Sequence, residues 1–397
     1  MKLLSVEEAR ARMLARVGPL GVEAVPLSRA MRRVLAANIV ATRDQPPFAA
    51  SAMDGWAVRA ADTPGRLAIV GESAAGHGFA GELAPGQAIR IFTGAPLPAG
   101  ANAVVIQEDA VRDGDAVTVP AAAPQFCIRA AGVDFQAGAT LLEAGARLDP
   151  WRLALAAAAG MADLQVHRRP RVVIVATGEE IVAPGAAVRP DQIFDSGSTA
   201  LSALVRFWGG LAEPLAGVGD DEAAIAGTVG GTTGDMVVTL GGASVGDHDL
   251  VKPALTRLGL ELDVESIAMR PGKPTWFGVL SDGRRVLGLP GNPASAMVCA
   301  QLFLRPLLLA LQGADPATPL IAAKTTLALP ANGEREHWMR ARLECRPTGE
   351  VTVTPFTDQD SSLVSVFAAA DSLIRRPPRA PAAEAGTALE VLPLQRL

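Results

Sequence analysis

The sequence predicts a multidomain protein that combines an α/β domain with two β-rich domains, and three patterns along the chain indicate this. Between residues 171 and 319, short apolar runs alternate with helical segments, which predicts a three-layer α/β domain with a mostly parallel sheet. Between residues 46 and 134, Val and Ile runs are separated by Gly and Pro, which predicts a β-rich inserted domain. From residue 320 to 397, short alternating runs predict a C-terminal β-barrel domain. A chain of 397 residues is long enough for several such domains.

The composition is that of a globular protein and argues against several classes of function. Apolar residues make up 49% and charged residues 19% of the chain, so a disordered protein is not expected. The net charge of −5 argues against a broad nucleic-acid surface, and the absence of Tyr argues against a base-stacking platform. Cys127, Cys299 and Cys345 lie far apart and form no CxxC pair, which argues against a zinc site and indicates a reducing compartment.

No segment of the sequence resembles a secretory signal or a membrane span. The N-terminus lacks a long apolar region, and no run of about 20 apolar residues occurs. The segment Trp151–Ala162 is apolar but short, and we interpret it as a buried helix that begins at Asp149 and Pro150. A cytoplasmic protein without membrane contacts is therefore expected.

The segments 1–45 and 135–170 flank the β-rich domain and predict an N-terminal α/β framework domain into which it is inserted. Ser5 and Glu8 form a capping box, which predicts a first helix from residue 6. The pattern of Leu27–Ala37 predicts a second helix.

Four polar residues of the β-rich region are candidate site residues. Asp54 lies among small residues before Gly55, and Thr93 ends a predicted strand. Arg129 and Asp134 follow in the segment RAAGVD. An Asp-Gly pair is also a common turn signal, so a purely structural role for Asp54 has similar weight.

The central stretch of the α/β region is a strand that runs into a glycine-rich loop. Met236–Leu240 is short, apolar and rich in β-branched residues, as in a strand buried on both faces. Gly241, Gly242 and Ser244 follow, and such a loop lets backbone N–H groups converge on an anion. Asp249 closes the loop. The alternative is an ordinary tight β-to-α turn with a helix cap.

Two later stretches have the same form, which favours a ligand site over a simple turn. MRPGKPTWF at 269–277 and LGLPGNPAS at 287–295 are read as short strands that run into loops of Pro, Gly and polar residues. Ligands of open α/β sheets bind beyond the carboxyl ends of the strands, so the three loops predict one site.

The loop residues would suit a phosphate-bearing substrate with a divalent metal. Mg²⁺ takes few protein oxygens, and two or three of the loop carboxylates could supply them, from among Asp54, Asp134, Glu179, Glu180, Asp220, Asp247 and Asp249. Arg270, Lys273 and one Arg of the segment REHWMR (Arg335 or Arg340) are the expected partners of an oxyanion, because acids cannot hold one. The alternative for each residue is a turn, a cap or a solvated side chain. The sequence contains no P-loop motif, and no GxGxxG follows a predicted strand.

Taken together, the motifs resemble the MoeA/gephyrin family, the molybdopterin molybdenumtransferases. The resemblance spans nearly the whole chain, and all motifs occur in the family's order. The most specific are SAMDGWA (51–57), FTGAPLPAGANAVVIQE (92–108), RAAGVD (129–134), TGEEI (177–181), GGASVGDHD (241–249), RPGKP (270–274) and LPGNPAS (289–295).

The resemblance implies an activity and a set of site residues. Members convert adenylylated molybdopterin and molybdate to molybdenum cofactor and AMP with Mg²⁺ or a similar cation, which makes the chain a Mg-dependent transferase. They are elongated homodimers, and the adenylyltransferase and molybdoenzyme-maturation proteins are the implied protein partners. The implied catalytic residues are Asp54, Thr93, Asp134, Glu180, Asp220 and Asp249, with Glu180, Asp220 and Asp249 on the metal. The implied substrate-binding residues are Arg129, Gly241, Gly242, Ser244, Arg270, Lys273, Pro290, Pro293 and Ser295.

Four positions differ from the family's usual pattern. Gly197 stands where Asn is common, and Leu240 stands where Ser or Thr is usual. Arg270 replaces the more common Lys, and Asp371 stands where Asn is usual.

Two other functions are alternatives to a molybdenum insertase. A molybdopterin adenylyltransferase would resemble only residues 171–319, so the other domains argue against it. A scaffold or carrier without turnover would need a docking segment, and no extended peptide-docking linker is visible.

Overall fold

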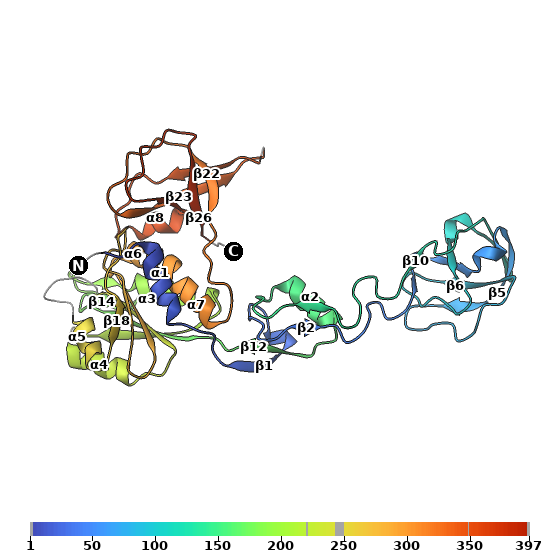
Figure 1. The fold of residues 1–397 in the computed structure, drawn as a ribbon, viewed down its shortest axis with the longest axis horizontal. Helices are drawn as coiled ribbons and strands as arrows, with labels where there is room; N and C mark the ends of the chain where they lie inside the picture. The colour runs from blue at the N-terminus through green and yellow to red at the C-terminus, as the bar shows by residue number, and fades with distance from the viewer. Residues whose placement is uncertain (1–2, 220, 243–249, 348, 395–397) are drawn as a thin grey trace. The chain divides into compact units, whose positions relative to one another are not determined.

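The computed structural model describes residues 3–219, 221–242, 250–347 and 349–394, and it divides into two compact units. Unit 1 comprises Met1–Ala24, Arg32–Ala36 and Gln165–Leu397. Unit 2 comprises Val25–Met31 and Ala37–Leu164. Figure 1 labels the elements of both units, which are described separately below.

Unit 1 is built around a six-stranded sheet that is mostly parallel. Its order is β16 (Leu211–Val218), β13 (Arg171–Thr177), β17 (Met236–Leu240), β21 (Arg285–Leu289), β20 (Trp276–Val279) and β18 (Glu261–Val264). The first four strands are parallel to one another, whereas β20 and β18 run antiparallel to their neighbours. All five residues of β17 are buried, as the apolar run predicts for a central strand.

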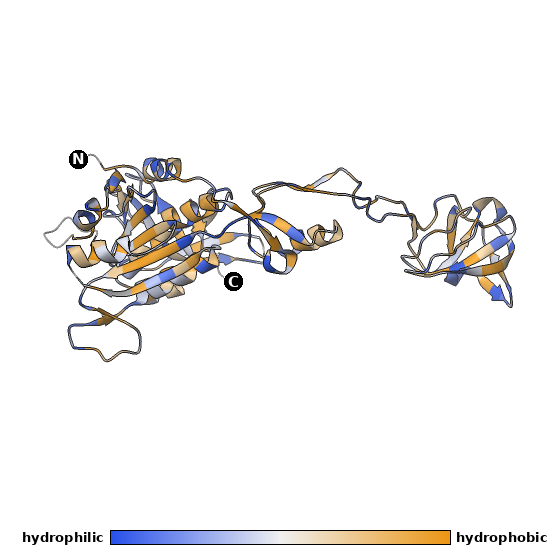
Figure 2. Cartoon of the chain, turned by 90° about the horizontal axis from the view of Figure 1, so that it is seen from below, coloured by the Kyte–Doolittle hydropathy of each residue, from blue (hydrophilic) through white to orange (hydrophobic). Residues whose placement is uncertain are grey.

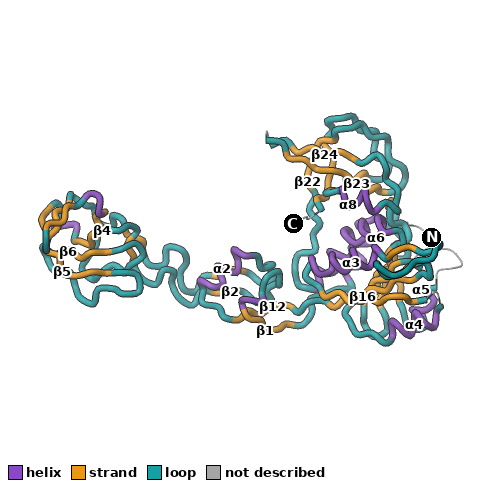
Figure 3. Tube along the Cα trace, turned by 180° about the vertical axis from the view of Figure 1, so that it is seen from behind, coloured by secondary structure: helices purple, strands orange, loops and turns teal. Residues whose placement is uncertain are grey.

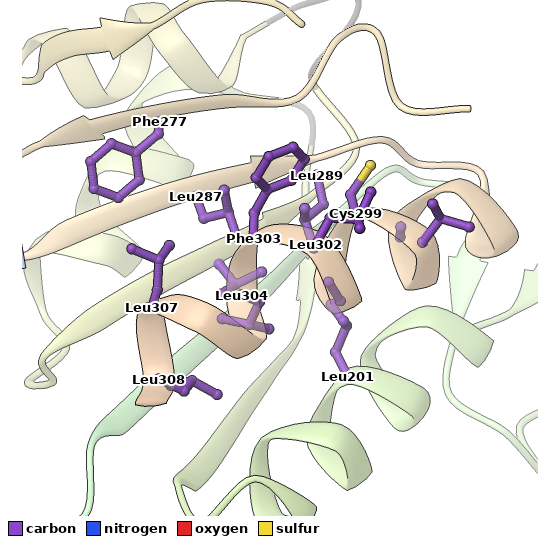
Figure 4. Close-up of a cluster of buried hydrophobic side chains, with 14 of the residues drawn as sticks. Leu201, Phe277, Leu287, Leu289, Cys299, Leu302, Phe303, Leu304, Leu307 and Leu308 are labelled. Carbon is purple, nitrogen blue, oxygen red and sulfur yellow. The ribbon is translucent and has the colours of Figure 1, made fainter. Parts of the chain in front are cut away.

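Helices cover both faces of this sheet, which confirms the predicted three-layer α/β domain. One face packs on α1 (Val6–Ala15), α3 (Ser196–Phe207), α6 (Pro293–Cys299) and α7 (Arg305–Leu311), and the other on α4 (Glu222–Gly230) and α5 (Val251–Thr256). Figure 4 shows the first core, where Phe277, Leu287 and Leu289 of the sheet meet Phe303 and Leu302. The predicted capping box of α1 is present, with the Ser5 hydroxyl accepting from the backbone N–H of Glu8.

The helical run Pro293–Leu311 contains a π-helical turn at Ala300–Leu304 between α6 and α7. By length and composition it is apolar enough to cross a membrane, but 89% of its apolar window is buried inside the protein. A core helix passes the same test, and this run forms part of the core in Figure 4.

Unit 2 contains a curled sheet of six strands, which confirms the predicted β-rich domain. The order is β7 (Ala103–Ile106), β4 (Gly55–Val58), β6 (Gln87–Ile91), β5 (Gly65–Ser73), β9 (Ala116–Val119) and β8 (Val111–Asp113). Apolar clusters form on both faces of the sheet, one around Trp56 and the other around Ile89. Figure 2 shows these hydrophobic stretches along the strands.

The rest of unit 2 is made of short elements. Two small sheets pair β3 (Ala50–Ser51) with β10 (Ile128–Arg129), and β2 (Ile39–Val40) with β11 (Thr140–Leu142). The helix α2 spans Pro150–Ala158. The strands β1 (Val22–Pro26) and β12 (Asp163–His167) lie where the chain changes from one unit to the other.

The C-terminal part of unit 1 is a closed five-stranded barrel, as predicted. Its strands are β23 (Glu336–Cys345), β24 (Val351–Pro355), β22 (Ile321–Thr325), β26 (Ala388–Pro393) and β25 (Ser372–Arg376). Pairing of β25 back to β23 closes the barrel. The short helix α8 (Val364–Ala369) precedes β25, and Figure 3 shows it in purple beside the barrel strands.

The predicted helix over Leu27–Ala37 is wrong. Only Leu27–Arg29 forms one 3₁₀ turn, and Arg32 has a φ of +63°, which no helix interior accommodates. Leu35 instead forms a β-bridge with Val166. The apolar residues whose spacing suggested a helix, such as Val34 and Leu35, are buried in a segment without helical structure.

The predicted burial of the helix after Asp149 is also wrong. The helix begins as expected, with the Asp149 carboxylate accepting from the N–H of Arg152 at 2.8 Å. However, Trp151 is 82% exposed, and Ala156 is the buried residue within α2. The apolar character of this segment comes mostly from Ala, which has a high helix propensity and is common on exposed helices.

Candidate functional site

A cavity of about 650 Å³ lies at the carboxyl ends of the parallel strands of unit 1. Thr177 is the last residue of β13, Gly241 and Gly242 follow β17, and Pro290 and Gly291 follow β21, so the ends of three strands contribute to one wall. This is the edge of an open α/β sheet at which ligands bind. The structure thus brings together the predicted residues Glu180, Gly241, Gly242, Pro290 and Pro293.

Close backbone contacts fix the relative position of the three loops. Gly241 has a φ of +86°, and a Cβ there would lie 3.0 Å from the carbonyl oxygen of Thr177. A Cβ on Gly291 would lie 3.4 Å from the Cα of Gly241. The Thr177 hydroxyl also donates to the Leu240 carbonyl at 3.4 Å. Any side chain at position 241 would therefore strain the backbone and separate the loops.

A small flap forms a second side of the cavity. It pairs β14 (Ile181–Val182) with β15 (Ile193–Phe194), and the N–H of Ile193 donates to the Glu180 carbonyl at 2.8 Å. The Glu180 side chain is exposed. Its carboxylate lies so close to Gly178 that a Cβ on residue 178 would collide with it. Glu180 is therefore free to present its charge to a ligand in the cavity.

Asp195 also lines the cavity, although the sequence did not single it out. It is the N-cap of α3, and its carboxylate accepts from the N–H of Ser198 at 2.8 Å. The segment Asp-Ser-Gly-Ser is a recognisable N-cap signal before an apolar helix, so it could have been noticed. What could not be seen is that this helix starts beside the central loop.

A loop of the barrel closes the cavity from the side of α6. The Asn292 side chain donates to the Ser361 hydroxyl at 3.0 Å, and the N–H of Ala294 donates to the Ser361 carbonyl at 3.2 Å. Ser362 lines the cavity, and its hydroxyl and N–H donate to Asp360 at 2.6 and 2.8 Å. These bonds, first the hydroxyl and then the N–H, lower the pKa of Asp360. Asn292 was likewise missed, because its partner lies in another domain.

The predicted oxyanion residues Arg270 and Lys273 lie on the segment that leads from the barrel to the α/β sheet, whereas Ser295 lies in α6. Lys273 is exposed and adjoins Pro274, which lines the cavity. Ser295 is buried in α6. The strand before the loop 271–275 was expected to belong to the α/β sheet. Instead, this strand, β19 (Met269–Arg270), pairs with β23 of the barrel. The loop still reaches the cavity edge because β20, which follows it, runs antiparallel to the other strands.

Arg270 is held by a histidine of the barrel. Its guanidinium donates to Nδ1 of His337 at 2.9 Å, and the two residues are register partners of β19 and β23. Burial is the largest cause that lowers the pKa of His337, and together with the nearby positive charges, Arg270 and Arg340 foremost, it brings this pKa to about 3. The imidazole is therefore neutral at ordinary pH and can accept this bond.

Four predicted residues belong to unit 2. The backbone N–H and the hydroxyl of Thr93 donate to one oxygen of Asp54 at 2.7 and 2.8 Å. Arg129 is exposed in β10, and the N–H of exposed Asp134 donates to the Gln45 carbonyl at 2.9 Å. The structure places Asp54 and Thr93 together within unit 2.

The predicted residues Asp220, Ser244 and Asp249 lie outside the described residues. Within the part of the chain that is described, no group of three or more His, Cys, Asp and Glu side chains could hold a metal ion. Of the predicted metal ligands, Glu180 is described, and its exposed carboxylate at the cavity suits one bond to a hard cation.

Two of the unusual positions lie against each other. Gly197 in α3 and Leu240 in β17 both line the cavity, and a Cβ on Gly197 would lie 3.1 Å from Cδ1 of Leu240. Asp371 is remote from them in the barrel, where its carboxylate accepts from the N–H of Leu343 at 2.6 Å.

A cavity with convergent polar groups at the strand ends of a three-layer domain is typical of a protein that binds a small molecule. Comparisons with known proteins agree and are more specific. Residues 4–160 match the MoeA N-terminal region (domain I and II), residues 173–310 a probable molybdopterin binding domain, and residues 322–394 the MoeA C-terminal region (domain IV).

Individual relatives match over almost the full length. Molybdopterin molybdenumtransferase 2 of Mycobacterium tuberculosis is 36% identical over 92% of this chain and 94% of its own. Molybdopterin molybdenumtransferase of Haemophilus influenzae is 33% identical over 94% of both chains. The crystal structure of a molybdopterin biosynthesis MoeA protein from Pyrococcus horikosii superposes with a TM-score of 0.85 at 31% identity, and covers 100% of both chains.

The chain therefore belongs to the molybdopterin molybdenumtransferase (MoeA) family, as its motifs predicted. This membership makes it a transferase of molybdenum cofactor biosynthesis.

Proposed function

We propose that the protein is a molybdenum insertase, which uses molybdate and adenylylated molybdopterin to form molybdenum cofactor and AMP. The observation that carries this proposal is the cavity itself, where glycine-rich loop backbone, an exposed carboxylate and a neighbouring Lys meet at the strand ends. Family membership supports the chemistry, because the relatives are named for molybdenum transfer to molybdopterin.

The residues of the cavity would have distinct roles in this reaction. The backbone at Gly241 and Gly242 allows close approach of the ligand, with Ser244 on the same loop and Pro290 and Pro293 on the facing one. Lys273, Arg270 and Ser295 would hold the molybdate oxygens next to the dithiolene, since cations and hydroxyls suit an oxyanion.

The carboxylates would serve the cleavage of the phosphoanhydride. Glu180 with Asp220 and Asp249 would hold Mg²⁺, which neutralises developing charge on a phosphoryl group when bound. Asp54 and Asp134 would position water or a proton at the leaving phosphate, with Thr93 keeping Asp54 ionised and Arg129 near the charged end of the substrate.

We further propose that the protein is a homodimer in which Asp54 of one copy serves the cavity of the other. The motif resemblance supports this arrangement. Asp54→Ala and Glu180→Gln, each strongly impaired alone, should together regain about a quarter of wild-type turnover when mixed and re-equilibrated, because a mixed dimer carries one intact site. Turnover that stays absent in the mixture, with mixed dimers present, would contradict a shared site.

The direct test is AMP release from adenylylated molybdopterin in the presence of Mg²⁺, with and without molybdate. Release that depends on molybdate is the expected result. Tight ligand binding without any release would favour a molybdopterin-binding scaffold or carrier instead.

A further inference from the structure

Arg90 lies in the curled sheet of unit 2, close to the pair formed by Asp54 and Thr93. It belongs to β6, and its register partner in β4 is Trp56, which comes two residues after Asp54. Thr93 comes two residues after Ile91, the last residue of β6. The sequence patterns did not single out Arg90, although the strand it belongs to leads directly to Thr93.

The guanidinium of Arg90 links two backbone segments around Asp54. Its Nη1 donates to the carbonyl of Gly55 at 3.0 Å, and its Nη2 donates to the side-chain oxygen of Gln107 at 2.6 Å. The backbone N–H of Gln107 in turn donates to the Asp54 carbonyl at 3.0 Å. One side chain thus connects the residue that follows Asp54 with the residue that binds the main chain of Asp54.

Two aromatic rings fix the orientation of this guanidinium. Its central carbon lies 4.7 Å from the centroid of the Phe92 ring and 5.4 Å from that of Trp56. Phe92 directly precedes Thr93, and Trp56 is buried. Contact with aromatic faces and a planar fork of donors are both properties of Arg, whereas Lys offers a single ammonium. A Lys at position 90 would therefore keep the charge but not the two-sided link.

The backbone beside Asp54 is tightly packed as well. A Cβ on Gly55 would lie 2.0 Å from the carbonyl oxygen of Val105, so β4 and β7 approach each other closely at this point. On its other side, the Asp54 carboxylate accepts both hydrogen bonds from Thr93. The main chain of Asp54 is thus held from the sheet through Arg90, and its carboxylate is held from the loop by Thr93.

We propose that Arg90 is a positioning residue of the reaction, whose guanidinium holds the Asp54–Thr93 pair in the geometry in which Asp54 acts on the substrate. The proposal rests on the proposed function, in which Asp54 positions water or a proton at the leaving phosphate.

The charge of Arg90 acts on Asp54 in addition to its hydrogen bonds. The backbone bond and then the hydroxyl bond from Thr93 lower the pKa of Asp54, and the positive charge of Arg90 lowers it further. Glu108, which accepts from the side-chain amide of Gln107 at 3.2 Å, is an acidic member of the same network. Position and ionisation of Asp54 therefore both depend on Arg90, and they can be measured separately.

The test compares molybdate-dependent AMP release in Arg90→Lys, Arg90→Met and the wild type at neutral pH. Asp54 is ionised in all three proteins at this pH, so a difference in rate reports its position. Both variants should lower kcat about 10- to 100-fold, the scale of a misplaced reacting group, and leave KM for adenylylated molybdopterin within about twofold. NMR titration of the Asp54 carboxyl carbon is the second readout. Arg90→Met should raise the pKa of Asp54, and Arg90→Lys should raise it less because the charge is kept.

Arg66→Met is the matched control, because Arg66 lies in β5 of the same sheet and pairs with Asp113 at 3.0 Å in an exposed position. It should show the kcat and the Asp54 pKa of the wild type. Gln107→Ala removes one acceptor of the Arg90 guanidinium, so combining it with Arg90→Met should cost little more than Arg90→Met alone. Thermal unfolding shows whether each variant keeps its fold, and Arg90→Lys decides the question if Arg90→Met does not fold.

Three results would overturn the proposal: wild-type kcat in folded Arg90→Lys, an equal loss of kcat in Arg66→Met, or a loss confined to KM. Failure of the proposed function has a different signature, because the wild type would then release no AMP on addition of molybdate. The titration does not depend on turnover, so an unchanged pKa of Asp54 in Arg90→Met would overturn the role of Arg90 in that case too.

Discussion

Thr93 donates two hydrogen bonds to a single oxygen of Asp54, one from its backbone N–H at 2.7 Å and one from its hydroxyl at 2.8 Å. The backbone bond, then the hydroxyl bond, lower the pKa of Asp54, and the positive charge of Arg90 acts in the same direction. Both residues come from motifs 39 positions apart in the sequence. The pair keeps an ionised carboxylate at the rim of the curled sheet.

Thr93→Val should raise the pKa of Asp54 part of the way toward its ordinary value, because the hydroxyl is lost and the backbone bond stays. The ionised form then needs a higher pH, so the acidic limb of the activity profile should move to higher pH. Any stability that the depressed pKa contributes is present above the ordinary pKa and is lost as pH falls. NMR titration of the Asp54 carboxyl carbon measures the shift. In Thr93→Ser the hydroxyl is kept, so the pKa of Asp54 should equal that of the wild type. A wild-type pKa of Asp54 in Thr93→Val would contradict the role of the hydroxyl bond.

Glu180→Gln should reduce molybdate-dependent AMP release roughly 10- to 100-fold and raise the Mg²⁺ concentration needed for half-maximal rate. The amide keeps the size of the side chain but loses its charge at the cavity. Its neighbour provides the control, since Glu179 is also exposed but does not line the cavity. The rates of Glu180→Gln and Glu179→Gln, measured over a series of Mg²⁺ concentrations, should therefore differ. The same Mg²⁺ dependence in both variants would show that Glu180 is not a metal ligand.

Lys273→Ala should raise the molybdate concentration required for turnover by about 10- to 100-fold, the range for losing one charge-assisted hydrogen bond. Lys273 is exposed, so the fold should be preserved. Molybdopterin binding should change much less, which isothermal titration can show. Lys324→Ala on the barrel removes another exposed Lys and its bond to Glu350, and should leave the molybdate dependence unchanged. An unaltered molybdate dependence in Lys273→Ala would exclude this residue from the oxyanion site.

Phe303→Ala should lower the free energy of unfolding by about 3–5 kcal/mol, because it opens a cavity in a fully buried core. Trp151→Ala should change it by no more than about 0.5 kcal/mol, as expected for an exposed position. Both are aromatic-to-Ala changes in helical segments. Urea unfolding followed by circular dichroism compares them, and similar losses would mean that α2 is buried after all.

Much of the architecture could be predicted because local signals agreed with the tertiary structure. The capping box at Ser5 and the apolar run Met236–Leu240 each describe their element directly. The domain types follow from how such elements alternate along the chain.

The errors came from residues whose environment is set by distant parts of the chain. The left-handed backbone of Arg32 and the bridge of Leu35 to Val166 leave no mark in local periodicity. The pairing of β19 with the barrel is equally invisible, because two residues carry no strand pattern.

The sequence predicted which loops form the site, but not the contacts between them that shape the cavity. The glycines at 241 and 242 predicted a loop whose N–H groups could converge on an anion, whereas the close approach of Gly241 to Thr177 was not predicted. The contacts of Asn292 with Ser361 and of Leu240 with Gly197 join segments 69 and 43 residues apart, and sequence spacing gives no hint of either.

The most direct measurement is a crystal structure of the protein grown with adenylylated molybdopterin and Mg²⁺ but without molybdate. We expect electron density for the ligand in the cavity between Thr177, Gly241 and Gly291. Ligand density elsewhere, for example in the groove of the barrel lined by Lys324 and Glu350, together with an empty cavity, would contradict the assignment of this cavity as the substrate site.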